Sequence, residues 1–156
     1  MRVWADIAWK YRVNGTYFWN VDYWPYSNSA LTTAPYSVYN VPTYEPRWGN
    51  GVLLYPGRRL QEIGLPAIKG PVYSIRLKAF RRGVQDYEYC YLAQSLGKNP
   101  DPIINAVITD GLGATTTPGS LGNWSHDPND WYQMRRNLAA LILGTSSIDD
   151  GLWQKY

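Results

Sequence analysis

One amphipathic helix constrains the fold of this chain more than any other feature of the sequence. Residues 74–96 (SIRLKAFRRGVQDYEYCYLAQSL) carry apolar side chains three and four positions apart, which is the spacing of a helix that buries one face. Ser74 is expected to cap the N-terminus of this helix, and Gly97 to end it. Gly83 costs a helix about 1 kcal/mol relative to alanine, so it predicts close packing against a neighbouring element. The predicted apolar stripe consists of Leu77, Phe80, Val84, Tyr87 and Tyr91.

The charged residues of this helix are expected to serve the structure rather than a reaction. Arg82 and Asp86 lie four positions apart, so they can form an ion pair worth a few tenths of a kcal/mol. Asp86 and Glu88 are therefore predicted to pair with arginines such as Arg82.

The segment before the long helix predicts an α/β chain. Residues 3–12 have helical spacing, a turn follows at 13–15, and the aromatic segment 16–21 is predicted to be a strand. Residues 22–70 hold six prolines and show no sustained periodicity, which predicts a long loop. Within that loop, residues 51–55 predict a short strand.

The segment after the long helix is simpler. Residues 103–109 form a short apolar run that fits either a helix or a strand, and residues 131–143 predict a final helix.

The composition excludes several classes of function. Of 156 residues, one is Cys and one is His, so an internal disulfide, a multi-cysteine or histidine metal centre and a histidine-based triad are not expected. No cofactor is predicted. The net charge is +3, but the basic residues are not gathered into a stripe, so nucleic-acid binding is not expected. No apolar run is long enough to predict a membrane span.

The high aromatic content fits two interpretations, and the composition does not decide between them. The chain has 8 Trp and 14 Tyr but only 2 Phe. Trp and Tyr combine a flat apolar face with a polar handle, which suits the surface of a sugar site as well as a core. A carbohydrate site and an aromatic core are therefore both compatible with this composition.

Three segments resemble one known family. They are WKYRVNGTYFW at residues 9–19, GNGVLLYPG at 49–57, and SIRLKAFRRGVQDYEY at 74–89. In order and spacing they are similar to the C-terminal region of glycoside hydrolase family 123 and the related domain of unknown function 4091. The third segment carries the family signature, Ser-Ile-Arg-Leu followed by Gly-x-x-Asp-Tyr-Glu-Tyr. Lys78, Arg82 and Asn50 stand where the family commonly has acidic residues, so a divergent member is implied.

The resemblance implies a fold. The family's fold is a (β/α)8 barrel, so residues 1–98 are expected to form its C-terminal part: the last strand, a long loop and the closing helix. Residues 99–156 are then a C-terminal extension with one helix. The remainder of its own barrel would be a partner of this chain if the chain is a fragment.

The implied barrel also locates a site. Active sites of such barrels lie at the C-terminal ends of the strands, a position that follows the predicted strand at 16–21. The predicted substrate-binding residues there are Trp19, Asn20, Asp22, Tyr23 and Trp24. Their aromatic rings, amide and carboxylate are what the wall of a sugar subsite requires.

The resemblance implies substrate-assisted, retaining cleavage of N-acetylhexosaminides by an adjacent Asp-Glu pair. This chain contains no Asp-Glu dipeptide, so no catalytic residue is assigned. The leading hypothesis is a hydrolase fragment that supplies part of the site wall and binds an N-acetylhexosamine-containing glycan. If the resemblance holds, the protein is secreted, periplasmic or at the cell surface. The alternatives are a non-catalytic carbohydrate-binding or structural domain, and a surface that binds protein partners.

Overall fold

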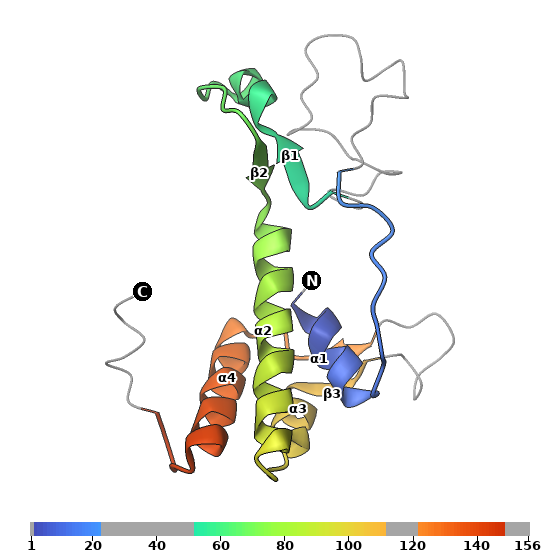
Figure 1. Cartoon of the computed structure of the whole chain (residues 1–156), viewed down its shortest axis with the longest axis vertical. Coiled ribbons are helices and arrows are strands. Elements are labelled where there is room, and N and C mark those ends of the chain that lie inside the picture. The colour runs from blue at the N-terminus through green and yellow to red at the C-terminus, as the bar shows by residue number, and fades with distance from the viewer. Residues whose placement is uncertain (1, 23–51, 112–121, 149–156) are drawn as a thin grey trace. The chain divides into compact units, whose positions relative to one another are not determined.

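The computed structural model describes residues 2–22, 52–111 and 122–148 (Figure 1). They belong to two compact units. Unit 1 holds the described residues between 17 and 79, and unit 2 holds residues 2–16 together with those from 80 onward. Residue 98, after which a domain boundary was predicted, lies inside unit 2, and the assignment to a barrel and its extension remains a prediction.

Unit 1 is built on a short antiparallel hairpin. Strand β1 (Leu54–Pro56) pairs with β2 (Pro71–Tyr73), with Leu54 opposite Tyr73 and Pro56 opposite Pro71. Between the strands lies the 3-10 helix η2 (Gly57–Ile63). A Cβ atom at Gly57 would lie 2.3 Å from the carbonyl oxygen of Gly70, so the hairpin requires glycine there. The predicted strand at 51–55 thus exists but begins and ends later in the chain.

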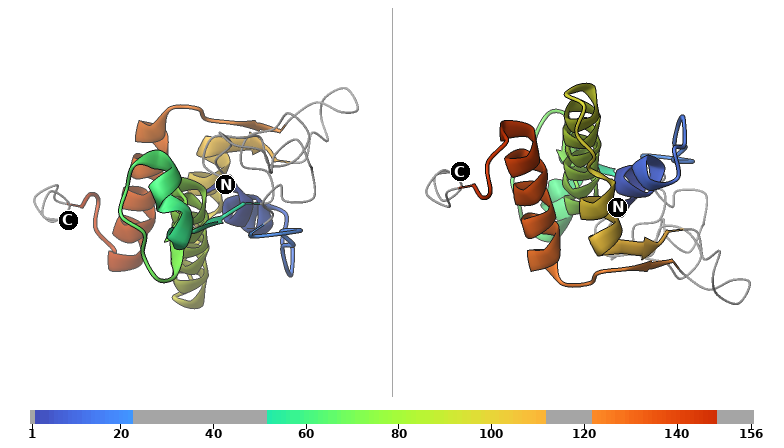
Figure 2. Two further views of the ribbon diagram at one scale, coloured as in Figure 1. Left: turned by 90° about the horizontal axis from the view of Figure 1, so that it is seen from above. Right: turned by 90° about the horizontal axis from the view of Figure 1, so that it is seen from below.

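Unit 2 is mainly helical. Its helices are α1 (Val3–Lys10), most of α2 (Ile75–Ser95), α3 (Asp101–Val107) and α4 (Pro128–Leu143). The run predicted as helix or strand is both, since β3 (Ile108–Asp110) follows α3 directly and pairs with β4 (Asn123–Trp124). Figures 1 and 2 show α1 and α4 on opposite sides of α2. The core that these elements enclose contains Val3, Trp9, Cys90, Ile104, Val107, Ile108, Trp131, Met134 and Leu138.

The strand predicted at residues 16–21 is wrong in the structure. These residues pair with no strand among the described residues, and Tyr17 is 81% exposed. Only an isolated bridge forms nearby, between Asp22 and Val52. Aromatic and β-branched residues favour a strand only where a neighbouring strand takes up the backbone hydrogen bonds, and among the described residues β1 meets this segment only at its last residue, Val21.

Helix α2 has the predicted bounds but buries a different face. The Ser74 hydroxyl accepts a hydrogen bond from the Leu77 amide at 3.1 Å, and Gly97 takes a positive φ of 72° after the last turn. Both end signals are therefore confirmed. The predicted stripe is only partly right, because Val84 and Tyr91 are exposed. The buried face consists of Gly83, Asp86, Cys90 and Ala93.

Gly83 confirms the prediction of close packing. A Cβ atom at this position would lie 2.0 Å from the backbone carbonyl oxygen of Arg2 and 2.9 Å from its carbonyl carbon. The backbone cannot yield as a flexible side chain would, so glycine is what allows the start of α1 to approach α2.

Replacing Gly83 with alanine is expected to lower the free energy of unfolding by about 1 to 3 kcal/mol. The clash with the Arg2 backbone outweighs the gain in helix propensity of about 1 kcal/mol that alanine would otherwise bring. Urea unfolding measures the change. Gln94→Ala, at an exposed position of the same helix, is the control and should change stability by less than about 0.5 kcal/mol. A Gly83→Ala variant as stable as the wild type would contradict this account of the packing.

Candidate functional site

A shallow hollow in unit 1 is the best candidate for a binding site, because it combines a predicted site residue with the predicted Tyr-Pro-Gly segment. Its volume is about 290 Å³. The hollow offers a carboxylate, a phenol ring and a guanidinium, together with glycines that let a ligand approach the backbone. Its lining residues are Asp22, Leu54, Tyr55, Pro56, Gly57, Arg58, Gly70 and Pro71.

Backbone hydrogen bonds fix Asp22 beside β1. The carbonyl oxygen of Val21 accepts hydrogen bonds from the amides of Leu53 at 2.7 Å and Leu54 at 2.9 Å. The amide of Asp22 in turn donates to Oδ1 of Asn20 at 3.0 Å. Residues 20–22 are thus held against the start of the hairpin, and the exposed carboxylate of Asp22 is brought to the edge of the hollow.

The first turn of α2 supports the opposite wall. Arg76 donates a hydrogen bond to the Tyr55 hydroxyl at 2.7 Å and another to the carbonyl oxygen of Val52 at 3.0 Å. The amide of Ser74 donates to the carbonyl oxygen of Leu53 at 3.0 Å. The Ser-Ile-Arg-Leu half of the signature therefore ties the helix to the segment that carries the hollow.

The structure brings together only part of the predicted site. Asp22 lines the hollow, whereas Asn20 serves it indirectly by holding the Asp22 amide. Trp19 is 41% exposed and lies outside the lining. Tyr23 and Trp24 lie outside the described residues. Sequence reasoning did not predict Tyr55 or Arg58 as lining residues, since no local pattern distinguishes a lining side chain from a packing one.

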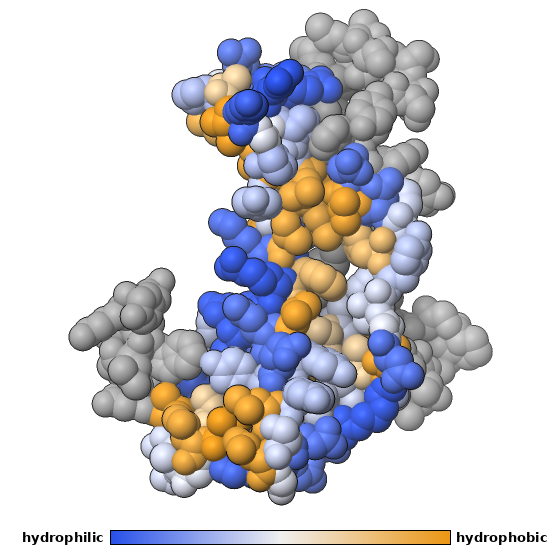
Figure 3. Space-filling model, in the orientation of Figure 1, coloured by the Kyte–Doolittle hydropathy of each residue, from blue (hydrophilic) through white to orange (hydrophobic). Residues whose placement is uncertain are grey.

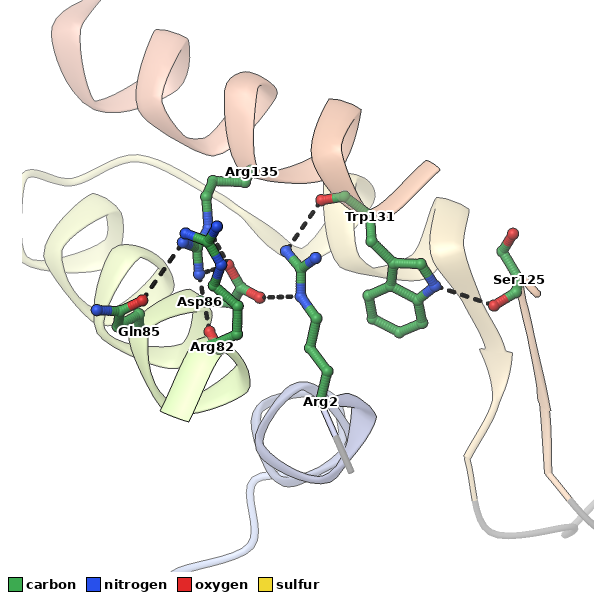
Figure 4. Close-up of polar contacts among 7 residues, drawn as sticks. All are labelled: Arg2, Arg82, Gln85, Asp86, Ser125, Trp131 and Arg135. Carbon is green, nitrogen blue, oxygen red and sulfur yellow. Dashed lines mark hydrogen bonds and ion pairs between the residues drawn. The ribbon is translucent and has the colours of Figure 1, made fainter. Parts of the chain in front are cut away.

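The other half of the signature builds a buried ion cluster in unit 2 (Figure 4). Asp86 is fully buried, and its two oxygens accept from Arg2 at 2.7 Å and from the guanidinium of Arg135 at 2.6 Å. The predicted pairing of Asp86 with Arg82 is wrong. Arg82 contributes its backbone carbonyl instead, which accepts from Arg135 at 2.8 Å. The structural role expected for Asp86 is right, but its partners come from two other elements.

Each arginine of this cluster also donates a hydrogen bond to a backbone carbonyl. Arg2 also donates to the carbonyl oxygen of Trp131 at 3.0 Å, and its guanidinium lies 5.5 Å from the centre of the Trp131 ring. Trp131 is fixed in turn by a hydrogen bond from its indole to the carbonyl oxygen of Ser125 at 3.0 Å. The cluster thus joins α2, α4 and the residue before α1.

Asp6 on α1 lies buried near this cluster. Burial, and next the Asp86 carboxylate, raise the pKa of Asp6 to about 8, against the opposing effect of Arg2 and Arg135. Burial also raises the pKa of the Cys90 thiol, with contributions from Asp6, Asp86 and Asp101. Cys90 is therefore a packed, neutral thiol of the core.

A larger hollow of about 420 Å³ lies in unit 2 between α2 and α4. It contains none of the residues predicted for the site, and its most buried charged group, Arg135, is already bound to Asp86. Figure 3 shows apolar surface at the C-terminal ends of the same two helices, where Leu92, Leu96 and Leu143 are exposed. Clustered apolar side chains of this kind are typical of surfaces that meet other proteins.

The described part of the chain contains neither a candidate metal site nor a candidate membrane-spanning helix. Residues 2–22, 52–111 and 122–148 contain no cluster of three or more His, Cys, Asp or Glu side chains that could hold a metal ion. Within the same ranges, no helix combines the length and apolar character needed to cross a bilayer. His126, the single histidine of the sequence, is exposed in the loop before α4.

Comparisons of this chain with family models, with curated proteins and with solved structures found no match.

Replacing Asp86 with asparagine is expected to lower the free energy of unfolding by about 3 to 5 kcal/mol. The amide cannot accept from both guanidiniums, so Arg135, whose side chain is 7% exposed, would stay buried with an uncompensated charge. Chemical denaturation measures the loss.

Glu62→Gln is the matched control for this variant. It breaks the more exposed ion pair between Arg59 and Glu62, which should cost no more than about 1 kcal/mol. Equal effects of the two substitutions would show that the Asp86 cluster contributes no more than a surface pair.

Proposed function

We propose that this chain supplies a carbohydrate-binding wall of a glycoside hydrolase-like protein. The observation that carries the proposal is the hollow of unit 1, where Asp22 lies with Tyr55 and Arg58. Asp22 was expected at a sugar site from its place after the aromatic segment, and Tyr55 belongs to a second segment that resembles the same family. The hollow thus combines a residue of one resembling segment with the carboxylate that follows the predicted strand at 16–21.

The side chains of the hollow fit the chemistry of a sugar. A carboxylate such as Asp22 accepts hydrogen bonds from vicinal hydroxyls, and a guanidinium such as Arg58 donates to ring and acyl oxygens. The face of Tyr55 can cover the C–H face of a sugar ring. A volume of about 290 Å³ is at the lower end for ligand pockets, which favours one sugar residue, such as an N-acetylhexosamine, over a long chain.

The residues that line the hollow are not proposed to catalyse hydrolysis. In the family that the chain resembles, an adjacent Asp-Glu pair performs substrate-assisted cleavage, and this sequence lacks that dipeptide. The chain is therefore proposed to bind sugar without cleaving it unaided. The alternative is a non-catalytic carbohydrate-binding or structural domain. If the parent reading frame encodes an upstream strand that ends in an Asp-Glu pair, the hydrolase hypothesis is favoured over this alternative.

Titration of the isotope-labelled chain with N-acetylgalactosamine is expected to shift the amide resonances of Asp22, Tyr55 and Arg58 at millimolar sugar. Asp22→Asn removes a charged acceptor, which is worth about 1.5 to 3 kcal/mol in a hydrogen bond, so the affinity should fall by about tenfold or more. Glu62→Gln, in the same unit but outside the hollow, should leave the affinity unchanged.

Two results would contradict the proposal. One is the absence of shifts at millimolar N-acetylgalactosamine, and the other is an Asp22→Asn variant that binds as tightly as the wild type. Shifts confined to residues of unit 2 would move the sugar site away from this hollow.

A further inference from the structure

The carboxyl group of Asp6 stands apart from the other buried polar groups of the described chain. Its side chain is fully buried, and neither of its oxygens has a hydrogen-bond partner among the described residues. A buried carboxylate without a partner costs several kcal/mol. A buried carboxyl group in a folded protein is therefore either paired with a hydrogen-bond donor or cation, or protonated and neutral.

The cationic neighbours of Asp6 direct their hydrogen bonds to other groups. Arg2, the residue before α1 and four residues before Asp6, donates to Asp86 and to the carbonyl oxygen of Trp131. Arg135, from α4, is bound to Asp86 and to the carbonyl oxygen of Arg82. Both guanidiniums thus donate to Asp86 and to a backbone carbonyl, and neither donates to Asp6.

The groups on α2 add to the penalty on a charged Asp6. Asp86 carries the negative charge that both arginines compensate, and it repels a second carboxylate. Cys90 is a buried thiol whose raised pKa keeps it neutral, so it does not compensate a charge on Asp6. On the side of α3, Asp101 is engaged with Trp9 and Arg12. Burial and Asp86 therefore favour the neutral form of the Asp6 carboxyl, and they outweigh the opposing effect of Arg2 and Arg135.

We propose that Asp6 is a proton-binding site that controls the docking of α1 onto the rest of unit 2. Helix α1 packs while the carboxyl is protonated, and loss of the proton drives the helix away from Asp86 toward water. The close approach of the Arg2 backbone to Gly83, one helical turn from Asp6, leaves little space in which the helix could adjust around a charge. This inference is independent of the sugar site.

The direction of the pH dependence follows from linkage. The carboxyl has a pKa of about 8 when α1 is docked and an ordinary value of 3.8 when the side chain is in water. Between these values only the docked form holds the proton. Each rise of one pH unit in this window therefore weakens docking by up to about tenfold, and the effect levels off above the upper value. Docking is thus strongest in acid and weakest in mild alkali.

Native-state hydrogen exchange of the full chain tests the proposal. After correction for the chemical exchange rate, protection of the α1 amides is expected to fall by up to roughly 100-fold between about pH 6 and about pH 8. Asp6→Asn, which cannot ionise, should reduce this fall to less than about threefold. Glu88→Gln, which removes an exposed acid from α2, should retain the wild-type fall.

An Asp6→Asn variant with the same fall as the wild type would overturn the proposal, and so would α1 amides whose protection does not change with pH. If the variant fails to fold, carbon-13 titration of the Asp6 carboxyl in the wild type gives a second test. A midpoint near neutral or mildly alkaline pH supports the proposal, and a midpoint near the ordinary 3.8 overturns it.

Discussion

The structure depends on one carboxylate, Asp86, held between two guanidiniums. Because Asp86 is fully buried, its charge is tolerable only while Arg2 and Arg135 both compensate it. That requirement holds the residue before α1 and the middle of α4 against α2 through one shared carboxylate, and Gly83 leaves room for the Arg2 backbone to come close. The helix signature is thus a scaffold: Ser74 and the residues just after it anchor the hairpin of unit 1, and its later half organises unit 2.

The sequence predicted the bounds of the long helix well, because end signals are local. Ser74 caps the helix with its own side chain, and Gly97 ends it with its own backbone conformation. A glycine inside a helix, such as Gly83, indicates close packing regardless of which element lies against it. The buried face was not predictable in the same way, because half-exposed tyrosines and buried small residues follow the same helical spacing. Nor could spacing reveal that the partners of Asp86 lie 84 and 49 residues away, when Arg82 stood one turn before it.

The candidate site was predicted only in part, for a related reason. Asp22 directly follows the aromatic segment, so its position in the chain predicted a place at the site. Tyr55 and Arg58 reach the same hollow through the hairpin, and no pattern within their own segment marks them as lining residues. The strand predicted at 16–21 failed because strand formation depends on a neighbouring strand, which no single segment can specify. The sugar site and the barrel remain proposals that rest on Asp22 and on the resemblance.

The most direct test of this account is a double-mutant cycle of Asp86→Asn and Arg135→Gln, with the free energy of unfolding as the readout. If the buried pair organises unit 2, the double variant should be more stable than the sum of the single effects implies, by more than about 1.5 kcal/mol. Single effects that add within about 0.5 kcal/mol would contradict it, since the two residues would then act independently and the signature would need another explanation.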